Sequence, residues 1–203
     1  MPKIALVLFD MHDVLCRYDL QKRLAGLARL SGRTPREIHA AIWESGFESE
    51  ADAGRLDAQA YLEGFGQRLG YPITLDEWLK NRKRAITPIP EVLGIMAALR
   101  GKPEIAVLTN NHTLVRTHLP FLFPELEVLC GEKFYVSAQF GAVKPDAQAY
   151  LRCVAAAGAA PDETLFIDDS RKNVEGALAA GLQGHVFTGA GALRAALAGH
   201  GVL

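Results

Sequence analysis

Apolar residues fall into short runs at the start of the chain and in its second half. The first run, residues 4–9, has six apolar residues in succession, which is typical of a short strand buried on both faces. Residues 105–108, 164–167 and 185–188 form further short strand candidates. Strands that alternate with helices predict an α/β fold with a doubly wound, Rossmann-like parallel sheet. Two weaker strand candidates cover 127–129 and 134–137, and helices are expected at 91–100, 145–158 and 173–180.

A long stretch of helical spacing separates the first strand from the second. Within it, Thr34 and Glu37 flank a proline at the first helical position, which is a strong signal for the start of a helix. We therefore predict a core domain over residues 1–16 and 87–203 and an inserted all-helical cap domain, free of strands, over residues 17–86. Its expected helices cover residues 19–29, 35–44, 57–69 and a segment that begins at residue 74.

The composition is that of an ordinary soluble protein, and it narrows the range of partners. The 203 residues include 22 basic and 23 acidic side chains, so there is no basic excess for binding nucleic acid. The sequence contains neither an apolar run long enough to span a membrane nor a signal peptide, so we expect a cytoplasmic protein, either a monomer or a homodimer. Three distant cysteines fit no disulfide framework or zinc spacing, which indicates reduced thiols: Cys16, Cys130 and Cys153.

Polar residues follow three of the predicted strands at the point where each strand ends. They are Asp10, the pair Thr109 and Asn110, and the pair Asp168 and Asp169. Because the carboxyl ends of parallel strands face one edge of a sheet, these groups can meet there. Carboxylates that share a site repel one another unless a cation joins them, and oxygen-only ligands favour Mg²⁺. The sequence therefore predicts a magnesium site at this edge.

The same edge also offers groups that suit a phosphate. The hydroxyl of Thr109, the backbone N–H after it and the ammonium of Lys144 are donors of the kind that phosphate oxygens need. When these groups neutralise the negative charge of the phosphate, Asp10 could attack its phosphorus atom and form an aspartyl-phosphate. Each residue taken alone could equally be a helix cap or a solvated side chain. Their joint order and placement favour a site.

The four segments that contain these residues resemble the motifs of the haloacid dehalogenase-like hydrolase superfamily. They read LFDMHDVL, VLTN, VKP and FIDDSRKNVEGA, and the resemblance extends to the position of the helical cap. Within this superfamily, the chain most resembles the subgroup of glucose-1-phosphate phosphatases and epoxide-hydrolase amino-terminal domains. The resemblance implies a magnesium-dependent phosphatase for a small phosphorylated metabolite, with sugar phosphates such as glucose 1-phosphate favoured.

The resemblance also implies a role for each residue. Asp10 would be the nucleophile and a magnesium ligand, and the backbone carbonyl of His12 and the carboxylates of Asp168 and Asp169 would complete the protein's share of the metal shell. The phosphoryl group would be held by Thr109 and Asn110, and Lys144 would balance its charge.

One position departs from the family pattern. Phosphatases of this family mostly place an aspartate two residues after the nucleophile, as general acid and base, whereas this chain has His12 there and Asp13 next to it. His12 could perform the acid–base work with a pKa near the working pH. Alternatively, Asp13 could swing in, although its side chain is expected to point away, or no acid is supplied and only good leaving groups react.

Two other functions stay open at this point. An impaired relative could act only as a binding module, and a metal-independent 2-haloacid dehalogenase would also lack the second aspartate, although Asp168 and Asp169 argue against it. In the cap, Trp43, Phe47 and Trp78 are expected to pack the helices, and the basic run at 80–84 is expected to be a solvated face rather than part of a substrate pocket.

Overall fold

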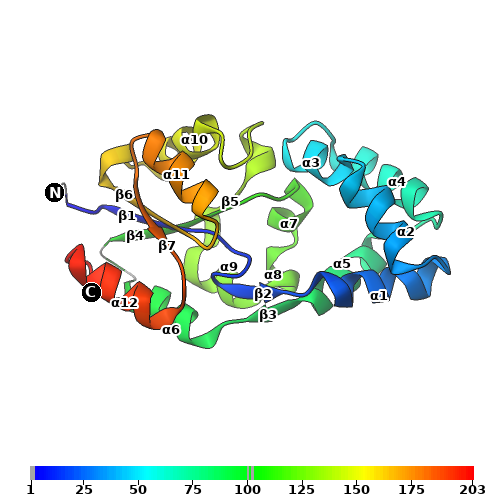
Figure 1. Ribbon diagram of the computed structural model, residues 1–203, viewed down its shortest axis with the longest axis horizontal. Helices are drawn as coiled ribbons and strands as arrows, with labels where there is room; N and C mark the ends of the chain where they lie inside the picture. Colours follow the sequence, from blue (N-terminus) through cyan, green and yellow to red (C-terminus); the bar gives the residue numbers. More distant parts are fainter. Residues whose placement is uncertain (1–2, 100, 102) are drawn as a thin grey trace.

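A computed structural model describes residues 3–99, 101 and 103–203. Its centre is a five-stranded, fully parallel sheet with the strand order β5–β4–β1–β6–β7 (Figure 1). This confirms the predicted α/β fold with a doubly wound sheet. Phe9 at the end of β1 pairs with Val107 on one side and Ile167 on the other, so the central strands end side by side. The strands are β1 Leu6–Phe9, β4 Glu104–Thr109, β5 Phe134–Val136, β6 Thr164–Asp168 and β7 Gln183–Val186.

Helices cover both faces of this sheet, which explains the uninterrupted apolar run in β1. Leu6 and Leu8 belong to the core on the face covered by α10 Ala147–Ala157 and α11 Arg171–Ala179 (Figure 1). Val7 and Phe9 belong to the core on the opposite face, which is covered by three helices. Because every residue of β1 is buried, no position along it is left for a polar side chain before Asp10. The three helices are α6 Pro90–Leu99, α9 Pro124–Cys130 and α12 Ala190–Gly199.

The stretch between β1 and α6 forms a helical block beside the sheet, on the right of Figure 1. Two short antiparallel strands join it to the rest, β2 Cys16–Tyr18 and β3 Ile86–Pro88, and they lie at the two ends of the segment that was predicted to contain no strand. Capping boxes at Thr34 and Thr74 start two of its helices. The block consists of α1 Leu20–Ser31, α2 Pro35–His39, the π-helix Ala40–Glu44, α3 Phe47–Asp52, α4 Ala58–Leu69 and α5 Leu75–Ala85.

Some local predictions were wrong or incomplete. Residues 127–129 were predicted as a weak strand but lie in α9, where Pro124 occupies the first turn and Leu126 and Cys130 share the buried face at helical spacing. The end of the helix predicted at 91–100 lies outside the described residues at position 100. The sequence pattern did not indicate α3, α7 Thr113–Thr117 or α8 Leu119–Leu122. Three 3₁₀ segments complete the described structure: Gly131–Lys133, Ser137–Gln139 and Pro161–Glu163.

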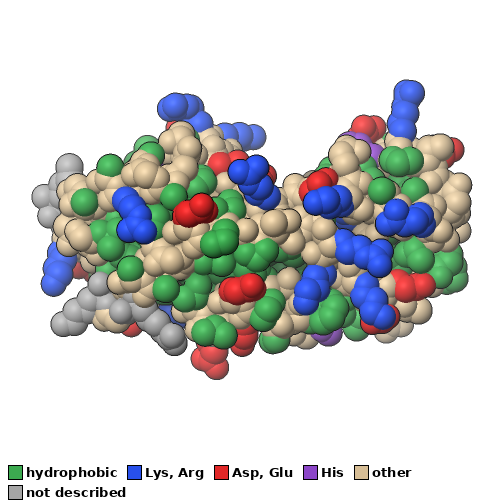
Figure 2. All heavy atoms as spheres, turned by 90° about the horizontal axis from the view of Figure 1, so that it is seen from below, with side chains coloured by type: hydrophobic (Ala, Val, Ile, Leu, Met, Phe, Trp, Pro, Cys, Tyr) green, Lys and Arg blue, Asp and Glu red, His purple; other side chains and the backbone are tan. Residues whose placement is uncertain are grey.

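The surface has two parts that match these two groups of elements. Figure 2 shows an outline indented between the sheet-containing part and the helical part, with many Lys and Arg side chains over the latter. Within the described residues, none of the helices combines the length and apolar character that crossing a bilayer requires. The cysteines are buried and unpaired, as predicted, and burial raises the pKa of each thiol: Cys16, Cys130 and Cys153.

Candidate active site

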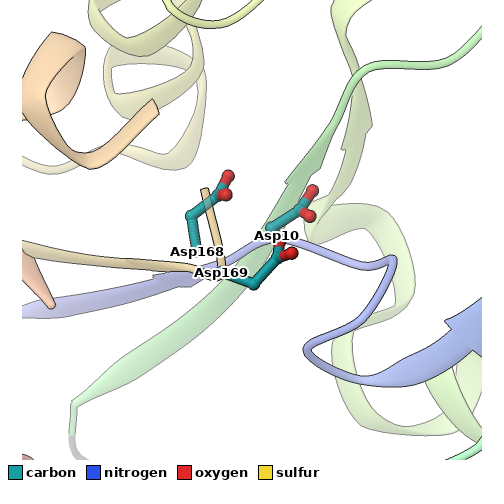
Figure 3. A group of neighbouring side chains, drawn as sticks. All are labelled: Asp10, Asp168 and Asp169. Carbon is teal, nitrogen blue, oxygen red and sulfur yellow. The ribbon is translucent and has the colours of Figure 1, made fainter. Parts of the chain in front are cut away.

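The carboxyl ends of two neighbouring strands, β1 and β6, bring together the acidic residues that the sequence singled out. Asp10 directly follows β1, Asp168 is the last residue of β6, and Asp169 comes next. Each offers a carboxylate oxygen, and these three oxygens lie within 4.8 Å of one another (Figure 3). Asp10 is only 8% exposed and Asp168 is fully buried, whereas Asp169 is exposed. The expected convergence at this edge of the sheet is therefore present in the structure.

Lys144 provides the positive charge at the centre of this group. Its Nζ lies 2.6 Å from Oδ1 of Asp10 and 2.8 Å from Oδ2 of Asp168, and its side chain is almost completely buried. Burial alone would lower the pKa of Lys144, but the charges and hydrogen bonds of the two aspartates raise it above its ordinary value. For Asp10 the balance differs, because burial outweighs the attraction of Lys144 and raises the pKa of its carboxyl to about 6.

Both oxygens of Asp168 are already engaged by hydrogen-bond donors. Oδ2 accepts from Lys144, and Oδ1 accepts from the backbone N–H of Ser170 at 2.8 Å. The side-chain amide of Asn173 donates to both oxygens, at 3.2 and 3.0 Å. Ser170 and Asn173 belong to the first turn of α11, so the start of this helix orients Asp168. Asp168 therefore holds Lys144 in place, and Asp169 is the more open of the two predicted metal ligands.

The backbone around Lys144 is fixed from two sides. The side-chain amide of Asn110 donates to the Lys144 carbonyl at 3.0 Å and accepts from the Lys144 N–H at 2.9 Å. On the other side, a Cβ added to Gly176 would lie 2.6 Å from the Pro145 carbonyl oxygen, so only glycine permits this approach of α11. The predicted phosphoryl contact of Asn110 thus falls to its backbone N–H, because its side chain holds the lysine loop.

Thr109, at the end of β4, belongs to a chain of hydrogen bonds that reaches the helical block. Its Oγ1 accepts from the side-chain amide of Asn111 at 2.8 Å, and the Asn111 side-chain oxygen accepts from Arg82. The Thr109 hydroxyl therefore keeps its own proton for donation. The backbone N–H of Asn111 donates to Ser137 Oγ at 3.0 Å. The sequence analysis assigned Asn111 no role, and its position after a strand end distinguishes it little from neighbouring residues.

His12 lies between the carboxylates and the helical block. Its ring stacks on Tyr18 with 4.3 Å between centroids, and its buried Nε2 has no hydrogen-bond partner among the described residues. Burial, followed by the positive charges of Arg82, Lys144 and Arg23, holds the pKa of His12 well below its ordinary value. A pKa near the working pH was expected from two opposing effects, nearby carboxylates that raise it and burial and a bound cation that lower it. The structure instead surrounds the imidazole with cations, which favour its neutral form.

Asp13 does not face the other carboxylates. Its side chain is exposed, and Oδ1 accepts a 3.4 Å hydrogen bond from the backbone N–H of Tyr18. Its φ angle of +57° places the residue in the left-handed region, where aspartate is tolerated better than most residues. Asp13 is therefore not one of the three converging carboxylates, although its charge acts on Asp169.

Asp169 completes a set of carboxylate oxygens that fits a divalent cation. Burial and the neighbouring charges of Asp168 and Asp13 raise the pKa of Asp169. Burial is the larger cause of the raised pKa of Asp10 and of Asp169, and the nearby charge of Asp168 adds to it in both cases. An oxygen-only set with one exposed carboxylate suits Mg²⁺, which retains several waters and binds through one or two carboxylates. The residues present therefore fit the metal that the sequence predicted.

The basic run in α5 is divided between surface and interior. Lys80, Lys83 and Arg84 are exposed, as the predicted solvated face requires, but Arg82 is buried and this part of the prediction was wrong. Trp78 and Arg82 lie four residues apart and share one helix face, so helical periodicity could have indicated its burial. Phe47 and Trp78 pack in the interior of the helical block as expected, and Trp43 packs against it half-buried.

Comparison with known proteins identifies the family. The model of the haloacid dehalogenase-like hydrolases matches residues 4–181, which cover most of the chain. The chain belongs to the haloacid dehalogenase-like hydrolase family. The family assignment confirms the resemblance found in the four sequence motifs, and it makes the protein a hydrolase.

Several individual relatives agree with this assignment. A D-ribitol-5-phosphate phosphatase from Bacteroides thetaiotaomicron is 24% identical over 178 residues, covering 83% of this chain and 84% of the relative. A predicted haloacid dehalogenase-like hydrolase from Porphyromonas gingivalis is 22% identical, with a TM-score of 0.75 and 90% coverage of both chains. A family enzyme from B. thetaiotaomicron, solved with magnesium and inorganic phosphate, is 21% identical, with a TM-score of 0.74 and coverage of 90% and 93%. At these identities the structural matches establish the shared fold.

Proposed function

We propose that the protein is a magnesium-dependent phosphatase that hydrolyses a small phosphorylated metabolite through an aspartyl-phosphate on Asp10. The observation that supports this most directly is the buried group of Asp10, Lys144 and Asp168 beside the open carboxylate of Asp169. One relative of this chain is a phosphatase, and a family enzyme with the same fold was solved with magnesium and inorganic phosphate. Both support the same chemistry.

In the first step, an Asp10 oxygen attacks the phosphorus atom, the bond to the leaving-group oxygen breaks with its electron pair on that oxygen, and the leaving group takes a proton from water. Lys144, held on its second side by Asp168, offsets the negative charge of nucleophile and phosphoryl group, and Thr109 donates its free proton to a phosphoryl oxygen. The backbone N–H of Asn110 is the next donor along the chain. We assign Asp10, Asp169 and the backbone carbonyl of His12 as ligands of Mg²⁺, with Asp168 beside them. When bound, the metal supplies positive charge against the phosphate oxygens.

In the second step, water attacks the phosphorus of the aspartyl-phosphate and Asp10 is released. A neutral His12 is suited to take a proton from this water, and it is poorly suited to protonate a leaving group in the first step. We therefore propose His12 as general base. Replacing it with Asn should slow breakdown of the intermediate, by about 10²–10⁴-fold if the base role is real.

The experiment is a screen of phosphate monoesters with and without magnesium. We expect turnover of an aryl phosphate and of sugar phosphates, glucose 1-phosphate among them. Asp10→Asn and Asp169→Ala should each abolish this turnover. Turnover that survives both a chelator and Asp169→Ala would refute the metal assignment. The phosphatase proposal fails if no phosphate ester is hydrolysed and the protein instead dehalogenates a 2-haloacid. It also fails if no phosphate ester is hydrolysed and the protein only forms a stable complex with another protein.

A further inference from the structure

Two arginines lie inside the molecule between the helical block and the candidate active site. Arg23 in α1 is 2% exposed and Arg82 in α5 is 3% exposed. A guanidinium group stays charged in a protein and offers five N–H donors, so its burial is costly unless these donors find partners. A pair of buried arginines in one place therefore calls for an explanation.

The partners inside the protein satisfy these arginines only in part. Arg23 Nη1 donates to the Tyr18 hydroxyl at 2.8 Å, and Arg82 Nη2 donates to the Asn111 side chain. Arg23 Nη2 and Arg82 Nε are buried and have no hydrogen-bond partner in the part of the chain that the structure describes. Across residues 3–99, 101 and 103–203, no carboxylate lies within 4.0 Å of either guanidinium.

Aromatic rings provide a second kind of support that leaves the N–H groups unpaired. The Trp78 ring lies 5.6 Å from the Arg23 guanidinium and 5.4 Å from that of Arg82. Such contacts stabilise the charge through the ring face, but they leave the in-plane N–H donors of a guanidinium unpaired. Both arginines are thus held in position with donors to spare.

Contacts through Tyr18 connect this pair of arginines to His12, beside the proposed phosphoryl site. Tyr18, which accepts from Arg23 and lies under Arg82, stacks directly on His12. His12 is two residues from Asp10, and the charges of both arginines act on its ring. A leaving group departs on the side opposite the attacking Asp10 oxygen, so a substrate in this site would extend past His12 towards the arginines.

The charge around the pair points to neutral polar groups. Glu48 and Asp52, one turn apart on α3, act on the arginines, and Glu48 accepts from the Tyr61 hydroxyl at 2.7 Å. The carboxylate of Asp52 makes no hydrogen bond within the described residues, while its carbonyl accepts from Ser137 at 2.7 Å. Glu48 and Asp52 offset part of the charge of the two arginines, which weakens the attraction for a second anion. Open donors beside an open acceptor match the hydroxyl group, which both donates and accepts.

We infer that Arg23, Arg82 and Asp52 form a hydroxyl-binding subsite for the leaving group, so that the preferred substrates are phosphate monoesters of polyols or sugars. This inference rests on the proposed phosphatase function. It adds the residues that select the substrate, none of which belongs to the four motifs that identified the family.

The test compares three magnesium-dependent substrates: ribitol 5-phosphate, p-nitrophenyl phosphate and the acidic ester 2-phosphoglycolate. We expect Arg23→Met, Arg82→Met and Asp52→Asn each to lower kcat/KM for ribitol 5-phosphate about 10–100-fold more than for the aryl ester, mainly through KM, because a hydrogen bond to a charged group contributes on that scale. Arg84→Met, an exposed arginine of the same helix, is the control and should leave this ratio unchanged.

Four outcomes would overturn the inference. If the variants lower all three substrates by the same factor, the arginines only support the fold. If 2-phosphoglycolate is the best substrate and loses most, the subsite binds anions. If the wild-type enzyme hydrolyses the aryl ester but, in an added comparison with the simple alkyl ester ethyl phosphate, does not prefer ribitol 5-phosphate, the inference fails while the phosphatase function stands. No hydrolysis of any ester would refute both. Where a Met variant does not fold, by circular dichroism, the corresponding Lys variant gives the same comparison, because it keeps the charge and loses the fork of donors.

Discussion

Replacement of Lys144 by Met should destabilise the protein strongly and in a pH-dependent way. The Lys144 ammonium lies 2.6 Å and 2.8 Å from oxygens of Asp10 and Asp168. Coulomb's law with an effective dielectric constant of about 20 gives roughly 6 kcal/mol for each contact. Desolvation of the buried ammonium offsets several kcal/mol of this sum, so the expected loss of unfolding free energy at pH 8 is about 3–5 kcal/mol.

The pH dependence follows from the two carboxylates that would lose their cation. Burial already raises the pKa of Asp10 to about 6 in the folded protein, above its ordinary value of 3.8, and removal of Lys144 raises it further. A carboxyl whose folded-state pKa is raised binds protons more tightly when folded, so its penalty is absent below the unfolded pKa and grows as pH rises through the folded pKa. The loss caused by Lys144→Met should therefore be clearly smaller at pH 5 than at pH 8.

Urea unfolding at both pH values, without metal, measures this effect. Lys172→Met is the matched control, because Lys172 is an exposed lysine in the first turn of α11 and should change stability by less than about 0.5 kcal/mol. Added Mg²⁺ should restore part of the stability of Lys144→Met by returning positive charge to the carboxylates. A loss below about 1 kcal/mol at pH 8, or an equal loss at pH 5, would show that Lys144 does not neutralise this group.

Three further substitutions test how the site is held together. Gly176→Ala places a Cβ 2.6 Å from the Pro145 carbonyl oxygen, which should lower the free energy of unfolding by about 1–3 kcal/mol and kcat at least about tenfold. Gly94→Ala, with open space around it, should not destabilise the protein, and equal melting temperatures for the two variants would refute the close approach. Asn111→Ala leaves the Thr109 hydroxyl without its donor and should lower kcat for an aryl phosphate about tenfold; an unchanged kcat would remove Asn111 from the site. Burial raises the pKa of Asp52 to about 7. After allowance for its partial exposure, Asp52→Asn should therefore stabilise the protein by about 2 kcal/mol at pH 8 and by much less at pH 5. The same gain at both pH values would contradict this.

The strand-end residues could be predicted because sheet topology alone brings them together. Asp10, Thr109 and Asp168 each follow an apolar run, and the parallel pairing of β1 with β4 and β6 places those three ends side by side. Lys144 was accessible only through its motif, since it lies on a loop that Asn110 and Gly176 position. Periodicity could also predict the helical block, because caps and apolar spacing are local properties of the chain.

The surroundings of His12 could not be predicted in the same way. Of its cationic neighbours, Arg82 comes from a helix that is distant in sequence from the motif, and the burial of both Arg23 and Arg82 depends on how the helical block packs. A pattern-based interpretation places a basic run on the surface by default. Burial, together with these two arginines and Lys144, favours the neutral form of His12.

The most direct test of the proposed mechanism is to detect the phosphorylated nucleophile. The protein is mixed with an aryl phosphate and Mg²⁺, quenched in acid during turnover, digested and analysed by mass spectrometry. The account predicts a phosphoryl group on the peptide that contains Asp10, more of it in His12→Asn because breakdown of the intermediate is slowed, and none in Asp10→Asn. Steady turnover without any modification of Asp10, or turnover that persists in Asp10→Asn, would contradict the account.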